Sequence, residues 1–394
     1  MSLSDFFQPI PLEHIRPEDG YSAAQLGAQI RLYVDQFPDL EGDEKPQLAL
    51  FGVNDDRKAV GNEGCAGGAD VVRRQFYQLF AGGIKVNMVD LGNIAAGETV
   101  KDTYIAVSTV CEELMKSDII PIIIGGGQDL TYAQFTAFEK LERRIEVAVV
   151  DPRFDIDQYN TEQAPLNSQT FLNHIILHEP DFLFNVNSIG YQSYFVSREA
   201  VDMYDKLYFN SSRLGNIMGQ IESAEPLVRS ADMLSFDMAA IRYSDAPANA
   251  NVTPNGLFGQ EACQLCRYAG MNDKLSSIGF YEYNPSLDIR RQTATLLAQM
   301  IWYFIDGFCH RKNDLPFSPP SAYITYRATL EHEGHEVVFV KSKKTDRWWM
   351  QVPYFGSKSV NERYYMVPCR YQDYQEALSG ELPELWWRTH QKLH

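Results

Sequence analysis

Residues 122–131 read Ile-Ile-Ile-Gly-Gly-Gly-Gln-Asp-Leu-Thr, an apolar run that ends at three glycines and continues with polar residues. Two later runs end in polar residues in the same way, Val149-Val-Asp-Pro-Arg-Phe-Asp155 and Leu234-Ser-Phe-Asp-Met-Ala239. Continuous apolar runs are typical of strands that are buried on both faces, as in a parallel sheet. Because ligands bind at the carboxyl ends of parallel strands, the residues after these runs should surround one crevice. They are Gln128, Asp151, Arg153, Asp155 and Asp237.

Short apolar runs recur along most of the chain and alternate with stretches of helical apolar spacing. The runs lie at 47–53, 84–90, 119–124, 146–151, 183–190, 206–209, 233–237 and 276–282. Buried strands that alternate with helices indicate a sheet covered by helices on both faces. The sequence therefore predicts an α/β fold, a three-layer α/β/α sandwich around a mostly parallel sheet of about eight strands.

The pattern changes near Leu315-Pro-Phe-Ser-Pro-Pro320, whose proline content predicts a boundary. We expect one domain over residues 1–320 and a C-terminal β-hairpin and helix appendage over residues 321–394. The predicted elements of the appendage are a hairpin at 336–340 and 348–352, a candidate third strand at 364–367, and a helix at 371–393 interrupted at Gly380 and Pro383.

Tryptophan is concentrated in the appendage, which holds four of the five tryptophans, at positions 348, 349, 386 and 387. Tryptophan and tyrosine are enriched at protein interfaces. We therefore expect the appendage to join copies into a homo-oligomer or to contact a protein partner. A lid packed on its own domain is the alternative.

The composition and net charge of the chain restrict the kinds of partner that it can bind. The chain has 394 residues, 45% of them hydrophobic, and a formal net charge of −17, which is typical of a globular protein without affinity for nucleic acid or anionic membrane. A cationic small molecule or a protein fits this charge better. The N-terminus does not resemble a signal peptide, no apolar stretch is long enough to span a membrane, and the six cysteines are scattered. We expect a cytoplasmic protein.

At the three polar strand ends the chain resembles the ureohydrolase family of arginase, agmatinase and formimidoylglutamase. Family members carry Gly-Gly-(Gly/Asp)-His, Asp-Ala-His-x-Asp and Ser-x-Asp-x-Asp at these positions. Five further segments resemble the family in the same order, so the resemblance covers about residues 40–310. They are 49–53, 62–68, 89–93, 255–259 and 280–285. The resemblance implies an arginase-like fold and, for active members, two manganese ions whose bridging hydroxide attacks a guanidino or formimino carbon.

Carried over to this chain, the family's metal ligands are only partly retained. The two bridging carboxylates match Asp151 and Asp237, and a third carboxylate matches Asp155. Gln128 and Arg153 stand in place of the two histidines, and the last aspartate is Ala239.

These departures define a degenerate metal site. A guanidinium has no lone pair to donate, whereas an all-oxygen set suits a hard cation. We expect no metal, or at most one divalent cation (Mn or Mg) at the Gln128/Asp151/Asp155/Asp237 position. Arg153 should bridge Asp151 and Asp237 in place of the second ion.

Glu282 matches the glutamate that faces the substrate's guanidino or amidino group in family members. Glu282 and Asp155 are therefore the candidates for catalysis, and Glu282 is also a candidate for substrate binding. Alternatively, Glu282 pairs with Arg153 or another internal base. His174 and His178, at i, i+4, offer the only imidazoles between residues 15 and 309, so His174 is a second candidate for substrate binding. A helix-surface or capping role is its alternative.

Two functions follow from this sequence. The first is a pseudoenzyme, an arginase-like protein that has lost binuclear manganese catalysis and serves in binding or assembly. The alternative is a metal-assisted hydrolase of linear amidines or guanidines, closest to formimidoylglutamase or agmatinase. A sensor of a cationic metabolite is a third, minor reading.

Overall fold

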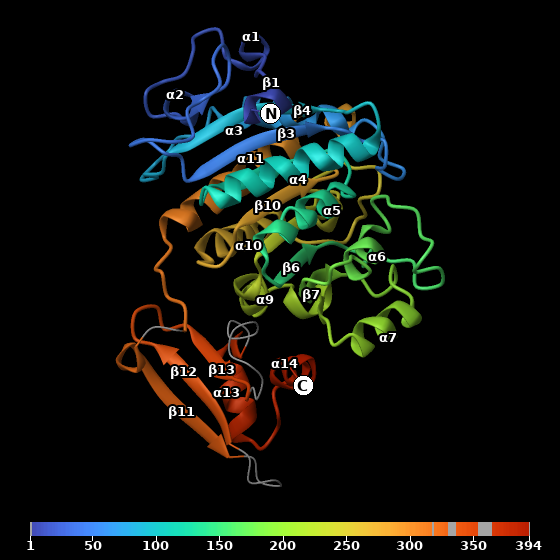
Figure 1. Ribbon diagram of the computed structural model, residues 1–394, viewed down its shortest axis with the longest axis vertical. Helices are drawn as coiled ribbons and strands as arrows, with labels where there is room; N and C mark the ends of the chain where they lie inside the picture. Colours follow the sequence, from blue (N-terminus) through green and yellow to red (C-terminus); the bar gives the residue numbers. More distant parts are fainter. Residues whose placement is uncertain (1, 317–318, 330–335, 354–364, 394) are drawn as a thin grey trace.

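The computed structural model describes residues 2–316, 319–329, 336–353 and 365–393. Its centre is a ten-stranded sheet in the order β1-β4-β3-β5-β10-β9-β6-β7-β8, with β2 also paired to β4 (Figure 1). Every pair in it is parallel except β1 with β4. The strands are β1 (Phe7–Gln8), β2 (Arg31–Leu32), β3 (Leu48–Asn54), β4 (Met88–Ala95), β5 (Ile120–Ile124), β6 (Ile145–Val150), β7 (Leu183–Tyr191), β8 (Asn210–Arg213), β9 (Met233–Asp237) and β10 (Ser277–Tyr281).

The predicted parallel sheet is thus confirmed, but it has ten strands where about eight were predicted, since β1 and β2 lie outside the predicted runs, and one predicted strand is misplaced. Residues 206–209 end a helix and turn, with φ of 55° at Tyr208, and the strand β8 follows them. The apolar signal at Leu207 and Phe209 comes from burial against the core and not from a strand. Because β8 is a polar edge strand, Asn-Ser-Ser-Arg, it carries no apolar pattern.

Helices cover both faces of the sheet and complete the predicted three layers (Figure 1). One face packs on α3, α8, α9, α10 and α11, and the other on α4, α5, α6 and α7. The helices are α1 (Leu12–Ile15), α2 (Leu26–Gln29), α3 (Gly68–Phe76), α4 (Val100–Lys116), α5 (Leu130–Thr136), α6 (Phe171–Ile176), α7 (Arg198–Lys206), α8 (Leu214–Ile217), α9 (Glu225–Ser230), α10 (Gly259–Met271) and α11 (Gln292–Cys309). No helix of the described residues is both long and apolar enough to cross a membrane.

The C-terminal appendage is a second, antiparallel sheet in the order β11-β12-β13-β14, with two helices. Its elements are β11 (Tyr323–Thr329), β12 (Glu336–Ser342), β13 (Trp348–Gln351), β14 (Met366–Cys369), α13 (Tyr371–Leu378) and α14 (Glu384–Leu393). The predicted hairpin and helix break are confirmed, and β11 is an additional strand. The third strand, predicted at 364–367, lies at Met366–Cys369, and residue 364 is outside the described residues. The break coincides with Gly380, whose φ of 90° ends α13.

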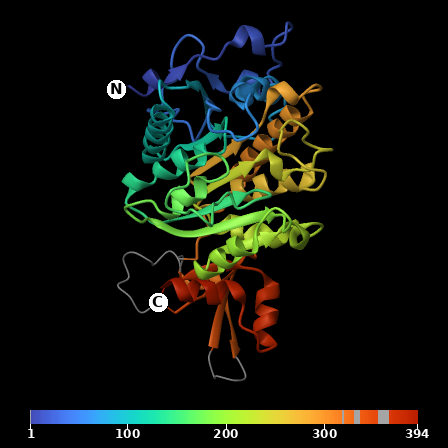
Figure 2. The ribbon, with the colours of Figure 1, turned by 90° about the vertical axis from the view of Figure 1, so that its right-hand side faces the viewer.

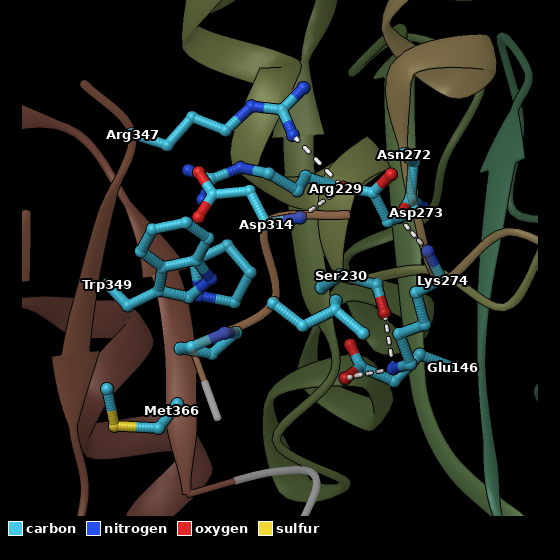
Figure 3. A pocket seen from close by; sticks show the side chains of 13 residues that line it. Glu146, Arg229, Ser230, Asn272, Asp273, Lys274, Asp314, Arg347, Trp349 and Met366 are labelled. Atoms are coloured by element: carbon cyan, nitrogen blue, oxygen red, sulfur yellow. Dashed lines mark hydrogen bonds and ion pairs between the residues drawn. The ribbon is translucent and has the colours of Figure 1, made fainter. Parts of the chain in front are cut away.

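The appendage lies below the sheet in Figure 2, and its hydrogen bonds fall on residues just before β8 and β9. Arg229, just before β9, donates to the carbonyls of Trp348 and Cys369 at 3.1 Å. Its guanidinium also lies over the Trp349 ring at 4.7 Å, and both of these side chains are labelled in Figure 3. Arg388 of α14 donates to the Phe209 carbonyl just before β8, at 2.7 Å. These contacts lie at the opposite end of the strands from the predicted crevice, so the appendage is no lid over it.

Candidate active site

Four acidic or amide side chains of the predicted site stand at the ends of neighbouring strands. Gln128 follows β5, Asp151 follows β6, Asp237 ends β9 and Glu282 follows β10. These strands are consecutive in the sheet, in the order β5-β10-β9-β6, and neighbouring strands lie about 4.8 Å apart. Residues from four distant parts of the sequence therefore meet beside the carboxyl ends of these strands, and all four are at least 92% buried.

The glycines before Gln128 let the backbone approach this crevice closely. A Cβ atom on Gly126 would stand 1.9 Å from the Asp55 carbonyl oxygen, and one on Gly125 would stand 2.3 Å from the Tyr281 ring. Only glycine fits such contacts. The Gln128 amide then donates to Glu282 Oε1 at 2.9 Å, which ties the two strand ends together.

Two asparagines that the sequence did not single out complete the site. Asn62 Nδ2 donates to Glu282 Oε2 at 2.7 Å and to the Glu282 carbonyl at 3.0 Å, and Asn249 Nδ2 donates to Asp237 Oδ1 at 3.3 Å. Both asparagines lie in loops, where local spacing gives no sign of what a side chain faces. The one sequence signal for either residue is that Asn62 begins the segment 62–68, which resembles the family.

The backbone holds two of the acids in an uncommon conformation. Asp155 has φ of 49° and Glu282 has φ of 67°, in the left-handed region that residues with a Cβ atom rarely adopt. Such conformations cluster at functional sites, because the surrounding structure must over-determine them. These two residues are also the ones that the sequence offered as catalytic candidates.

The four carboxyl groups are buried close to one another, which raises their pKa values. Burial is the main cause at each group, and it raises the pKa of Asp155 to about 7. Burial likewise raises the pKa of Asp151, Asp237 and Glu282 well above the ordinary range, with further increases from the neighbouring acid in each case. Arg153 opposes the increase at Asp155 and Asp237 through its charge.

Arg153 does not bridge Asp151 and Asp237, and that prediction is wrong. Its guanidinium lies over the Phe195 ring at 4.4 Å. Its backbone amide, not its side chain, donates to Asp151 Oδ1, at 2.6 Å. Among the described residues, no guanidinium, ammonium or imidazole lies within ion-pair distance of any of the four carboxylates, so Glu282 pairs with Asn62 and not with a base. The half-buried guanidinium therefore has the aromatic ring as its cation–π partner.

His174 contacts none of these carboxyl groups, and Ala239 offers them no side-chain ligand. His174 Nε2 is hydrogen-bonded to the Ala164 carbonyl at 2.9 Å, and its ring packs against Tyr132, so neither contact involves a site carboxylate. Ala239 lies at the site, but it contributes only its amide, which donates to Asp237 Oδ1 at 2.7 Å. Its methyl group offers no ligand at the family's last aspartate position.

The residues present fit one hard cation better than two manganese ions. Gln128 Oε1 and Asp151 Oδ2 are buried acceptor atoms without a donor. Oxygen acceptors of this kind suit Mg²⁺ or Mn²⁺. Within the described residues, however, no three His, Cys, Asp or Glu side chains are grouped so as to hold an ion. The second metal position has the worse fit, because Arg153 and Ala239 provide no lone pair there.

Comparison with known proteins agrees with this fold. Residues 46–306 match the Arginase family. A formimidoylglutamase of Staphylococcus haemolyticus is 24% identical over 278 residues, which cover 66% of this chain and 86% of that protein. A formimidoylglutamase of Staphylococcus aureus is 26% identical over 289 residues, which cover 68% of this chain and 90% of that protein. The crystal structure of formimidoylglutamase from Bacillus subtilis superposes with a TM-score of 0.64 at 18% identity, covering 75% of this chain and 94% of that one. With the family matched over residues 46–306 and the same fold around the crevice, this chain belongs to the arginase family.

Proposed function

We propose that this arginase-family chain is a binding protein without binuclear manganese hydrolysis, and that its acidic crevice receives a small positively charged group. The observation that carries the proposal is the replacement of three ligand positions by Gln128, Arg153 and Ala239. Arg153 lies over Phe195, so the four buried carboxyl groups have no cation of their own chain among the described residues within ion-pair distance. Buried acids without a counter-charge favour binding of a cation from outside.

A single Mn²⁺ or Mg²⁺ is one cation that this crevice would accept. Gln128 Oε1 and Asp151 Oδ2 would hold it, with Asp155 and Asp237 nearby. When bound, such an ion would lower the pKa of a water molecule, although less than a pair of ions. A guanidinium or amidinium group is the other cation, and Glu282, fixed by Asn62, would accept hydrogen bonds from it.

A second candidate is hydrolysis of linear amidines, and two observations favour it. The relatives reported above are formimidoylglutamases and are matched over 86% and 90% of their own length. Asp155 and Glu282, the two candidate catalytic acids, are both retained and both held in the left-handed conformation. In this reading Glu282 would orient the amidinium and Asp155 would accept a proton from the attacking water.

Metal analysis combined with activity assays tests the proposal. The purified chain is loaded with excess Mn²⁺, desalted and analysed for bound metal, and is then assayed for formamide and urea release from formiminoglutamate, agmatine and arginine. We expect fewer than two ions per chain and no product. Two tightly bound ions together with formamide release would favour the second candidate.

Restoring the family's ligands provides the positive control. The triple variant Gln128→His, Arg153→His and Ala239→Asp should bind more Mn²⁺ than wild type, because it regains two imidazoles and a carboxylate. Gln220→His is the matched control, since it adds an imidazole at an exposed position away from the crevice. If the triple variant binds no more Mn²⁺ than this control, the assignment of the ligand positions is wrong.

A further inference from the structure

A cleft lies at the amino-terminal ends of β3, β5 and β10, which are neighbours in the sheet. Gln47, Ile119 and Ser276, the residues just before these strands, line it, together with the end of α11 and the residues that follow this helix. The volume of the cleft is about 630 Å³, which is within the range of small-molecule sites. The acid cluster stands at the carboxyl ends of the strands, so the cleft is a separate part of the molecule.

The cleft has an excess of basic residues, although the chain as a whole has a net charge of −17. The charged residues that line it are Lys85, Arg143, Lys274 and Arg311, against Asp118 and Asp273. Lys274 is already neutralised, since its ammonium pairs with Asp232 at 3.0 Å and with Glu146 at 3.3 Å (Figure 3). The other three basic side chains give the cleft a positive charge, and positive charge in a concave site attracts anions.

Arg311 places a guanidinium charge at the cleft in a largely buried position. The guanidinium donates to the Gly270 carbonyl at 2.9 Å and to the Leu275 carbonyl at 3.0 Å, which fixes its position. Within the part of the chain that the structure describes, no carboxylate lies within ion-pair distance of it, and burial lowers the pKa of Arg311 to about 10. Asp273 opposes this decrease through its charge, but its carboxylate accepts hydrogen bonds from two backbone amides. An anion bound beside Arg311 would supply the missing counter-charge.

The rest of the lining combines further basic groups with apolar surface. Arg143 Nη2 donates to Ser276 Oγ at 2.8 Å, and Lys85 is exposed. The apolar residues of the cleft are Met115, Ile119, Ile120, Leu141, Leu275 and Phe308. A ligand that carries a charged group on an apolar body would therefore match both parts of the lining.

We propose that this cleft binds a small organic anion, whose phosphate or carboxylate group is held by Lys85, Arg143 and Arg311 and whose apolar body packs on the apolar lining. Guanidinium groups recognise both kinds of anion through paired hydrogen bonds. The proposal is independent of the function proposed for the acidic crevice, which would receive a cation at the other end of the strands. The metal and activity assays described above therefore do not test it.

Cys309 lines the cleft and provides the readout for a protection experiment. It is exposed, whereas the other five cysteines of the chain are buried, so iodoacetamide should alkylate Cys309 first in the folded protein. The rate is followed by intact mass at constant ionic strength, with phenyl phosphate, benzoate or benzylammonium as the probe. At about ten times its dissociation constant, a bound anion should slow the alkylation about tenfold, since only the free fraction reacts. Benzylammonium should not slow it.

The pattern of protection decides the outcome. Protection by phenyl phosphate alone would identify the ligand class as phosphates, protection by benzoate alone would identify it as carboxylates, and protection by both would support the shared chemistry. Absence of protection by either anion would overturn the proposal. Equal protection by benzylammonium would overturn it too, because the cleft would then recognise only the apolar ring.

Two lysine variants separate a specific contact from a general effect of charge. Lys85→Gln should raise the phenyl phosphate concentration for half-maximal protection by about fivefold, the upper end for a contact between exposed charges. Lys312→Gln is the matched control and should leave this concentration unchanged, because Lys312 is exposed and follows Arg311 but does not line the cleft. Equal effects of the two substitutions would overturn the assignment of the anion to this cleft.

Arg311→Gln should abolish the protection, because it removes the buried charge. The same substitution also removes the hydrogen bonds to the Gly270 and Leu275 carbonyls, so thermal melting must verify that the variant folds. If a folded Arg311→Gln variant were protected as well as wild type, the proposal would be wrong. The lysine variants decide the question if Arg311→Gln does not fold.

Discussion

Arg153 is a residue whose contacts differ from those predicted for the site. Its position in the sequence matches a metal-binding histidine of the family, yet its guanidinium lies over Phe195 at 4.4 Å. A cation–π contact at a partly exposed site contributes about 0.5–1 kcal/mol, far less than a buried ion pair. We therefore expect Arg153→Ala to reduce the free energy of unfolding by no more than about 1 kcal/mol, measured by urea denaturation.

Arg73 provides the matched control for this prediction. Its guanidinium is fully buried and pairs with Asp90 at 2.8 Å. Removing it leaves an uncompensated buried carboxylate, which costs about 3–5 kcal/mol. If Arg153→Ala were as destabilising as Arg73→Ala, Arg153 would have to pair with the site carboxylates in solution.

Asp155 gives the metal-free protein a specific pH dependence. Its pKa is raised to about 7 by burial, so the folded state binds a proton that the unfolded state releases near pH 4. The resulting stabilisation is complete below about pH 4 and is lost as the pH rises through about 7. We expect the melting temperature of the metal-free chain to fall between pH 5.5 and pH 8 (roughly the window of this shift).

The substitution Asp155→Asn should reduce this fall of the melting temperature with pH. Asparagine has the same shape, tolerates the left-handed conformation and does not ionise. At pH 8 the variant should be more stable than wild type by about 2–4 kcal/mol, since it no longer buries a charge. Asp102→Asn is the control, because the pKa of Asp102 is lowered by its hydrogen bonds with Thr99 and its titration lies below this window. If the melting temperature of Asp155→Asn fell with pH as steeply as that of wild type, the other carboxyl groups would be the main source of the pH dependence.

At the scale of elements, α14 attaches the appendage to the sheet. Arg388 donates to the Phe209 carbonyl at 2.7 Å and to Asp205 at 2.8 Å, and its side chain is 15% exposed. Losing such charged hydrogen bonds costs about 1–3 kcal/mol. Arg388→Ala should therefore increase amide hydrogen exchange throughout α14, which is measurable by mass spectrometry.

Arg327→Ala is the control for Arg388→Ala. It pairs with Glu336 at 2.6 Å within the appendage, but its side chain is 62% exposed. Exposed pairs contribute about 0–1 kcal/mol, so Arg327→Ala should leave the exchange of α14 unchanged. Equal exchange in the two variants would mean that the Arg388 contacts do not anchor the helix.

At the scale of the whole molecule, the crevice and the appendage lie at opposite ends of the parallel strands. All pairings of the ten-stranded sheet fall within the predicted first domain, residues 1–320. A chain that ends at residue 320 should therefore keep its fold. Its melting temperature should be lower, because Arg229 loses both of its carbonyl acceptors in the appendage. Aggregation of the shortened chain would show that residue 320 is not a domain boundary.

The tryptophans of the appendage bear on its predicted interface. Trp348 and Trp349 are buried, and Trp386 donates to the Gln351 carbonyl at 2.9 Å, whereas Trp387 is 48% exposed. Three of the four are thus used within the chain. Their abundance therefore gives no support to an oligomer, and an interface through the appendage stays a prediction.

The parallel sheet, its helical layers and the residues at its strand ends can be predicted from local sequence patterns. Continuous apolar runs reveal strands because burial on both faces is a local property of the side chains, and Gln128, Asp151 and Asp237 follow directly from it. The polar edge strand β8 lacks that property, and its predicted position, 206–209, is wrong by four residues.

Which loops meet, and where their side chains point, depends on the packing of the whole fold. Strand order brings Asn62 and Asn249 to Glu282 and Asp237, and no spacing within the loops encodes it. Arg153 turns to Phe195 because a distant loop offers an aromatic face, while burial disfavours the charged form of the nearer acids. The direction of a side chain depends on the free energies of all its available partners, and most of those partners are distant in the sequence.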